Sequence, residues 1–120
     1  MTIQEAAAAS GLSIDTIRFY EKAGMTPPVP RDARGWRTFP PSLVEWLTNL
    51  ARLRATGMPM VEMQRFARLV HAVPSPEVIA ERLTILREHN VCLAQRRAEL
   101  EAAQDYLDHK IAVYSGKDTI

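Results

Sequence analysis

The stretch Gly11-Leu-Ser-Ile-Asp-Thr-Ile-Arg-Phe-Tyr-Glu-Lys-Ala-Gly24 is the most informative part of this sequence for the fold. Ser13 is suited to cap a helix and Gly24 to end one, and the apolar residues between them recur at helical spacing. The Ala-rich run at 3–9 predicts another short helix, which Ser10 and Gly11 interrupt. Two short helices joined by a tight, glycine-containing turn predict a helix-turn-helix.

The segment that follows predicts a wing and two more helices. Three prolines between residues 27 and 30 favour extended backbone, and strand-forming residues around Gly35 predict a small β-hairpin at 31–39. Apolar spacing then predicts one helix that opens at Pro41 and ends at Gly57, and a second that opens at Pro59. The predicted fold class is therefore mainly α, with a winged helix-turn-helix domain at 1–72.

One long helix is predicted over 75–115. Ser75 and Pro76 suit its start, and no Gly or Pro follows before Gly116, which gives a length of roughly 60 Å. Apolar residues follow a heptad spacing, as in a coiled coil, and the chain offers no second long helix to cover them, so a homodimer is expected. The alternative is a long helix folded back on its own domain. The expected dimer seam comprises Ile79, Leu83, Leu86, Asn90, Leu93, Arg97, Leu100, Gln104, Leu107, Ile111 and Tyr114.

Composition and charge narrow the function classes. The 120 residues are 47% hydrophobic and 24% charged, as in a soluble globular domain, and the net charge of +1 excludes a strongly basic tail. Between Thr16 and Thr56, however, seven basic residues stand against three acidic ones, which suggests a polyanion-binding face. No run is long enough to span a membrane and no signal-peptide layout is present, so a cytoplasmic location is expected.

Several motifs together resemble the MerR family of bacterial transcription regulators. They are the quoted stretch, the Pro27-Pro28 pair, the Gly35-Trp-Arg-Thr-Phe39 segment of the wing, and Leu53-Arg-Ala-Thr-Gly-Met58. The resemblance covers residues 1 to about 70. The end of the long helix, Leu107-Asp-His-Lys-Ile-Ala-Val-Tyr114, resembles a branch of small members without an effector domain, which includes thiol- and aldehyde-responsive regulators.

The resemblance implies a set of DNA contacts. In a winged helix-turn-helix, polar side chains of the second helix reach base edges in the major groove, while the wing meets flanking backbone or minor groove. Phe19, Phe39 and Trp46 are expected in the core rather than stacked on bases. Trp36 is also expected to pack, although it is kept among the wing contacts. The candidate DNA-binding residues are Ser13, Asp15, Thr16, Arg18, Tyr20, Arg31, Arg34, Trp36, Arg37 and Arg54.

The chain departs from the family pattern at three kinds of position. Pro40 and Pro59 stand where Ser or Thr usually caps a helix, and Trp36 replaces the usual wing tyrosine. Arg52 occupies the position of the sensing cysteine in the thiol-responsive branch. The single cysteine, Cys92, is a candidate sensor, against the alternative that it is a small packing residue. One cysteine excludes a disulfide framework and a Cys-rich zinc finger. His89 and Cys92, spaced as i and i+3, could offer two ligands to a metal, but two are too few, so neither a metal nor another cofactor is expected.

The expected partners are double-stranded promoter DNA and a second copy of the chain, with RNA polymerase affected indirectly and no membrane involved. The family resemblance implies that the dimer binds a palindromic site in the promoter spacer and distorts it. One alternative is a protein-interaction adaptor that uses the long helix without specific DNA binding. Another is an architectural DNA binder of the excisionase type, which usually lacks such a helix. An enzyme is not expected, because no phosphate loop or nucleophile elbow is present.

Overall fold

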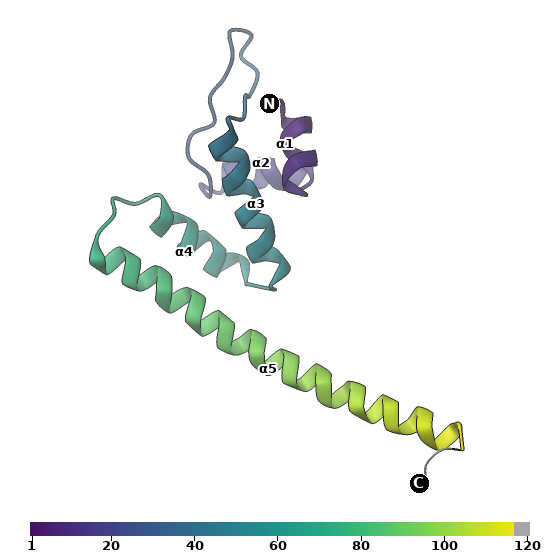
Figure 1. Ribbon diagram of the computed structural model, residues 1–120. Coiled ribbons are helices and arrows are strands. Elements are labelled where there is room, and N and C mark those ends of the chain that lie inside the picture. Colours follow the sequence, from purple (N-terminus) through teal and green to yellow (C-terminus); the bar gives the residue numbers. More distant parts are fainter. Residues whose placement is uncertain (117–120) are drawn as a thin grey trace. The chain divides into compact units, whose positions relative to one another are not determined.

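The computed structural model describes residues 1–116 and is built from five helices joined by short loops (Figure 1). By internal contacts the chain forms two compact units, Met1–Ile85 and the part from Leu86 onward. None of the helices in the described residues is long and apolar enough to cross a membrane. The helices are α1 (Ile3–Ser10), α2 (Ile14–Lys22), α3 (Pro41–Ala55), α4 (Met60–Val70) and α5 (Pro76–Tyr114).

The predicted helix-turn-helix is confirmed, and local capping explains its boundaries. Ser13 caps α2, since its hydroxyl accepts a hydrogen bond from the Thr16 N–H at 3.1 Å. Gly11 follows α1 with φ of +78° and Gly24 follows α2 with φ of +73°, a left-handed conformation that glycine adopts without steric cost. Both helices therefore end where the sequence predicts.

The helices α3 and α4 begin without a side-chain cap. Pro40 and Pro59 are their N-cap residues, and neither makes a capping hydrogen bond. Pro41 at the first turn of α3 instead fixes the backbone φ in a helical value. Apolar burial anchors both helices: Leu47 and Leu50 of α3 and Met63 of α4 are almost fully buried.

The core of the first unit lies where α1 packs on α2 and α3, and where α4 packs on α3. Tyr20, Phe39 and Met25 fill it from α2 and the loop before α3. The first turns of α5 also belong to this unit: Ile85 is 1% exposed in the same core, and the Arg82 guanidinium donates to the Leu69 carbonyl at 2.8 Å. The start of α5 is thereby fixed to α4.

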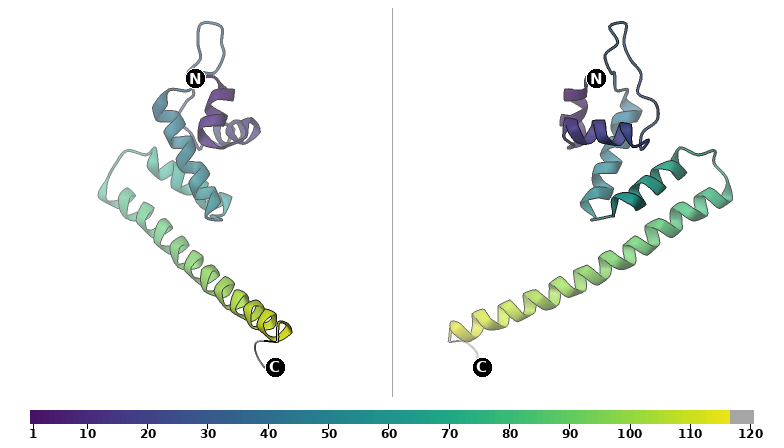
Figure 2. Two further views of the ribbon diagram at one scale, coloured as in Figure 1. Left: turned by 45° about the vertical axis from the view of Figure 1, so that its right-hand side comes forward. Right: turned by 180° about the vertical axis from the view of Figure 1, so that it is seen from behind.

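The predicted β-hairpin is not confirmed as strands. Within residues 1–116 the segment is a loop with a single antiparallel bridge between Arg31 and Arg37, and it extends past the start of α1 in all three views (Figures 1 and 2). Prolines before it remove backbone donors, and the Asp32 side chain takes up N–H groups that a longer ladder would use. The wing is therefore a turn closed at its base.

Of the four aromatic residues expected in the core, two are packed there and two are exposed. Phe39 is buried, and Trp46 is half-buried with its Nε1–H donating to the Met25 carbonyl at 2.8 Å, so these two pack as expected. The expectation was wrong for Phe19 and Trp36, which are 49% and 63% exposed. Phe19 lies on the outer face of α2, and Trp36 lies in the projecting loop, where no neighbouring element covers it.

The helix α5 runs for 39 residues without a break, as predicted. Ser75 caps it, because its hydroxyl accepts from the Val78 N–H at 3.1 Å. Along its heptad stripe most apolar side chains face solvent, with Leu100 at 66% and Tyr114 at 88% exposed. The exposed members of this stripe are Ile79, Leu83, Leu86, Leu100, Leu107, Ile111 and Tyr114.

Candidate nucleic-acid interface

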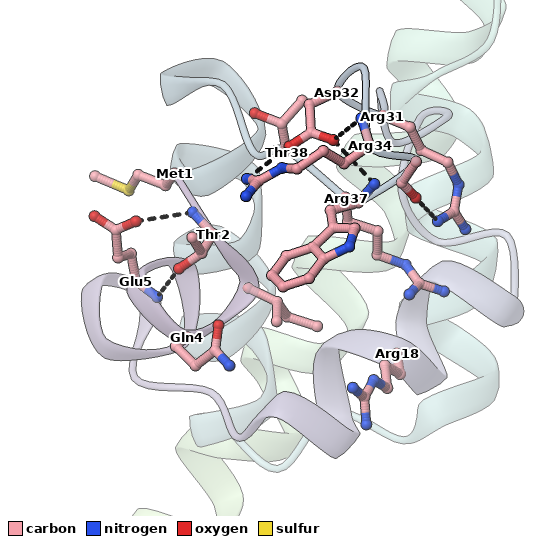
Figure 3. Close-up of a pocket in the computed structure, with 13 residues that line it drawn as sticks. Met1, Thr2, Gln4, Glu5, Arg18, Arg31, Asp32, Arg34, Arg37 and Thr38 are labelled. Atoms are coloured by element: carbon pink, nitrogen blue, oxygen red, sulfur yellow. Dashed lines mark hydrogen bonds and ion pairs between the residues drawn. The ribbon is translucent and has the colours of Figure 1, made fainter.

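Arginines gather around one hollow in the first unit. The hollow has a volume of about 560 Å³ and lies between the start of α1, the exposed face of α2 and the wing (Figure 3). Residues from α1 form one side, Arg18 reaches it from α2, and the wing closes the rest. Four arginines, one from α2 and three from the wing, line this hollow, so their positive charges add up in one place. These four are Arg18, Arg31, Arg34 and Arg37.

The start of α2 presents a polar group to solvent. Arg18 lies 3.9 Å from the Asp15 carboxylate, and both side chains are largely exposed. The Ser13 hydroxyl donates to Thr16 Oγ1 at 2.8 Å, and the Arg54 guanidinium reaches the same oxygen at 3.4 Å. The last turn of α3 is thereby brought to the first turn of α2, although the two residues stand 38 apart in sequence.

Asp32 organises the wing. Its carboxylate accepts from the backbone N–H groups of Arg34 at 2.9 Å and Trp36 at 3.1 Å. The Trp36 N–H, followed by the contacts from Arg34, lowers the pKa of Asp32 below its ordinary value. Gly35 has φ of +80°, which lets the turn reverse direction. A charged carboxylate thus closes the loop at neutral pH.

The wing side chains are held in defined positions. The Arg34 guanidinium lies 4.7 Å from the centre of the Trp36 ring and pairs with Asp32 at 3.2 Å. Arg31 donates to the Gly35 carbonyl at 2.8 Å. The exposed indole therefore carries a cation on its face, and the loop is compact in spite of its exposure.

Sequence reasoning missed Glu21. Its carboxylate accepts from Arg37 Nε at 2.7 Å, and both side chains are partly sheltered, at 24% and 33% exposed. The pair joins the last turn of α2 to the wing across 16 residues. No local sequence signal marks such a pair, because it depends on how the wing folds back against α2.

Two smaller features of the hollow were also missed. Thr2 and Glu5 form a reciprocal capping box at the start of α1, and the hydrogen bonds from Thr2 lower the pKa of Glu5. The Thr-x-x-Glu spacing is a known signature of this cap, so the sequence carried the signal. The Met1 ammonium donates to the Phe39 carbonyl at 3.1 Å, which brings a further positive charge to the base of the wing.

Tyr20 does not lie with the other candidate residues. It is fully buried, hydroxyl included, and that hydroxyl has no hydrogen-bond partner. As a candidate DNA contact, Tyr20 was expected to offer its hydroxyl to a phosphate while its ring packs inward. The ring does pack inward, but in this conformation the surrounding core excludes a phosphate from the hydroxyl oxygen.

Cys92 lies on the exposed surface of α5 as a free thiol. In the part of the chain that the structure describes, no three His, Cys, Asp or Glu side chains come together as a metal site.

Comparison with known proteins connects this geometry to a family. Residues 1–69 match the family described as MerR HTH family regulatory protein. An HTH-type transcriptional regulator of Haemophilus influenzae is 35% identical over 113 residues, which cover 94% of this chain and 82% of that protein.

Two solved structures share the fold over nearly the whole chain. HiNmlR, a MerR family regulator that lacks the sensor domain and was crystallised bound to promoter DNA, superposes with a TM-score of 0.81 at 35% identity, covering 96% of this chain and 90% of that one. A MerR family regulator from Listeria monocytogenes superposes with a TM-score of 0.86 at 30% identity, covering 96% and 86%.

Proposed function

The chain belongs to the MerR HTH family of regulatory proteins, and on that premise we propose that it regulates transcription by binding a palindromic promoter site as a homodimer. The observation that carries the proposal is the hollow lined by Arg18, Arg31, Arg34 and Arg37. Guanidinium groups pair with phosphates, and Arg also reads guanine in the major groove. HiNmlR, to which this chain is 35% identical, was crystallised bound to promoter DNA, which supports promoter DNA as the ligand of this chain.

The two elements around the hollow have different roles. Helix α2 enters the major groove, where Arg18, Thr16 and Ser13 face base edges and nearby phosphates. Arg54 holds Thr16 from α3 and adds a positive charge at the same end. The wing lies against the flanking backbone or minor groove with Arg31, Arg34 and Trp36. Base contacts supply specificity, and the wing supplies most of the salt-dependent affinity.

Selection of duplexes from random DNA tests this function directly. The purified protein enriches one palindromic sequence, and its binding to that sequence is compared with binding to a scrambled duplex at two salt concentrations. Specific binding exceeds non-specific binding by about 10³-fold or more. A protein that enriches no sequence contradicts the proposal and favours the adaptor alternative.

A second copy of the chain covers the stripe on α5. Seven apolar side chains of the heptad stripe are exposed, and an identical stripe on another chain is complementary to it. Asn90, Arg97 and Gln104 interrupt the stripe at equivalent heptad positions. Such polar positions fix the register of a coiled coil at some cost in stability.

The charge pattern of α5 favours antiparallel pairing. In a parallel dimer, Arg97 would meet its own counterpart in the seam. In an antiparallel dimer, an a position faces a d position of the second chain, so Arg97 would not meet its own counterpart and would pack beside an apolar d residue. Pairs of like charge are destabilising, so the antiparallel arrangement has the lower energy.

The dimer controls transcription by distorting the promoter spacer, so that polymerase engages both promoter elements without touching the regulator. Bending a site of this size costs on the order of 1–6 kcal/mol, which contacts from two winged domains offset. In vitro transcription from templates that differ only in spacer length tests this step. A shortened spacer makes the promoter active without the protein, and bound protein then represses it. If the shortened promoter still requires the protein, recruitment of polymerase replaces distortion.

A further inference from the structure

We propose that Glu21 is a positioning residue for DNA binding: its carboxylate holds Arg37 so that the wing and helix α2 engage the duplex as one unit. The inference rests on the proposed function and deepens it. Glu21 is negatively charged, as DNA is, so its role is not a direct contact with the duplex. A carboxylate beside phosphates weakens DNA binding by electrostatic repulsion. A positioning role for Glu21 would offset that cost.

The geometry of the pair supports that task. Arg37 donates through Nε to Glu21 at 2.7 Å, a length typical of a strong charge-assisted hydrogen bond. The bond uses one of the five N–H groups of the guanidinium, and the terminal nitrogens carry the other four. Glu21 therefore orients the group toward the hollow that Arg37 lines, while donors for a phosphate remain.

The place of Arg37 in the loop extends the effect to the whole wing. Arg37 forms the antiparallel bridge with Arg31, and the Asp32 N–H donates to the Trp36 carbonyl at 2.8 Å. A backbone held at Arg37 therefore holds Arg31, Arg34 and Trp36 as well. The pair fixes the wing against the last turn of α2, whose first turns present Arg18.

The positioning role and simple electrostatics predict opposite changes in DNA affinity when Glu21 loses its charge. Glu21→Gln removes a negative charge from the DNA-facing side, so charge alone predicts tighter binding and an unchanged or steeper salt dependence. Loss of positioning instead frees Arg37 and the wing, and binding to the selected palindromic duplex weakens by about tenfold, the effect of losing one charge-assisted contact. The salt slope also falls by about one charge for each half-site.

The experiment measures dissociation constants for that duplex at several salt concentrations, at a temperature where circular dichroism shows every variant folded. Glu21→Asp keeps the charge and recovers most of the affinity. Glu62→Gln is the matched control, because it removes the same charge from the exposed Glu62–Arg65 pair on α4. Its affinity and salt slope stay close to those of the unchanged protein.

A double-variant comparison separates positioning from a general effect on stability. In an Arg37→Ala background, Glu21→Gln causes no further loss of affinity if the carboxylate acts through Arg37. Equal losses in both backgrounds overturn the inference, as does a Glu21→Gln protein that binds as tightly as the unchanged one or more tightly. If the unchanged protein itself binds no duplex, the proposed function fails, which is a separate result from failure of the positioning role.

Discussion

The two units of the chain differ in how far their apolar side chains are buried. Every buried apolar residue of the core falls between Ala6 and Ile85, where helices close around one another. Between Leu86 and Gly116 no apolar side chain becomes fully buried, although the helix carries a regular apolar stripe. The first unit therefore buries a core of its own, whereas the apolar stripe of the second unit stays exposed.

The difference indicates how the fold divides the work. A self-contained unit can present the arginines around the hollow without help, because α1, α2, α3 and the wing hold one another. A long apolar stripe on one helix, by contrast, is stable in water chiefly when it packs against a second helix. On the proposed function, the arginines around the hollow bind DNA and the stripe on α5 mediates assembly, so substitutions at these two places should have separable effects.

The largest expected effect is on assembly. Leu100→Glu places a charge in the middle of the proposed seam, where burial of an unpaired carboxylate costs several kcal/mol. Sedimentation should show a dimer for the unchanged protein and a monomer or aggregate for the variant, with loss of palindrome binding. Ala102→Glu is the control, since it adds the same charge outside the stripe on the exposed surface of α5 and should remain dimeric. If the unchanged protein is a monomer at tens of micromolar, the stripe on α5 does not mediate dimerisation and the proposed division between the two units is wrong.

A core substitution should affect the first unit by a different route. Leu47 is fully buried in α3, and Leu47→Ala should lower the free energy of unfolding by roughly 2–5 kcal/mol through the cavity it leaves. Thermal denaturation followed by circular dichroism measures the loss, with exposed Glu45→Ala as the control. The dimer should still assemble at temperatures where the variant is folded. Dissociation into folded monomers would show that the two units are not separable.

A smaller effect is expected at the binding surface. Arg18→Ala should weaken specific binding by ~1–3 kcal/mol while scrambled DNA is affected less, if the guanidinium reads a base. If it holds phosphate alone, all duplexes should lose affinity and the salt slope should fall by about one per half-site. Fluorescence anisotropy at two salt concentrations distinguishes these outcomes. Unchanged binding would exclude both roles for Arg18. In every case the Tm of the Arg18→Ala variant should stay near that of the unchanged protein, because the Arg18 side chain is largely exposed.

The smallest effect is expected at the single thiol. Cys92 is exposed on α5 and lies off the seam in the heptad register, so Cys92→Ser should change dimer stability and DNA affinity by no more than ~0.5 kcal/mol. Regulation should also persist in the variant. A protein that binds its operator normally but loses a response to peroxide or electrophiles would instead identify Cys92 as the sensor, and α5 would then carry a signal as well as assembly.

Local signals in the sequence were enough to predict the helices. The cap at Ser13, the stop at Gly24 and the uninterrupted run after Pro76 each act within a turn of the residue concerned, so the boundaries of α2 and α5 followed from the sequence. The arginines that line the hollow were also identified, because a basic segment next to a helix-turn-helix is visible in the sequence.

What could not be predicted depends on contacts between distant segments or on competition within a loop. The Glu21–Arg37 pair spans 16 residues and exists only once the wing has folded back. The wing has the strand-forming residues of a hairpin, yet the Asp32 carboxylate binds N–H groups of the loop and a turn results. Phe19 and Trp36 were expected in the core but lie exposed, because tertiary packing decides which face of α2 and which part of the wing other elements cover.

In the proposed complex, two copies of this chain bind the two half-sites of one duplex. Its most direct test is the binding of the unchanged protein to the selected palindrome and to a duplex in which one half-site is replaced by unrelated sequence. We expect two chains per palindromic duplex and an affinity about 10²–10⁴-fold lower for the half-replaced duplex, because the second winged domain then has no half-site to bind while it is tethered to the first. One chain per duplex, with equal affinity for both, would contradict it.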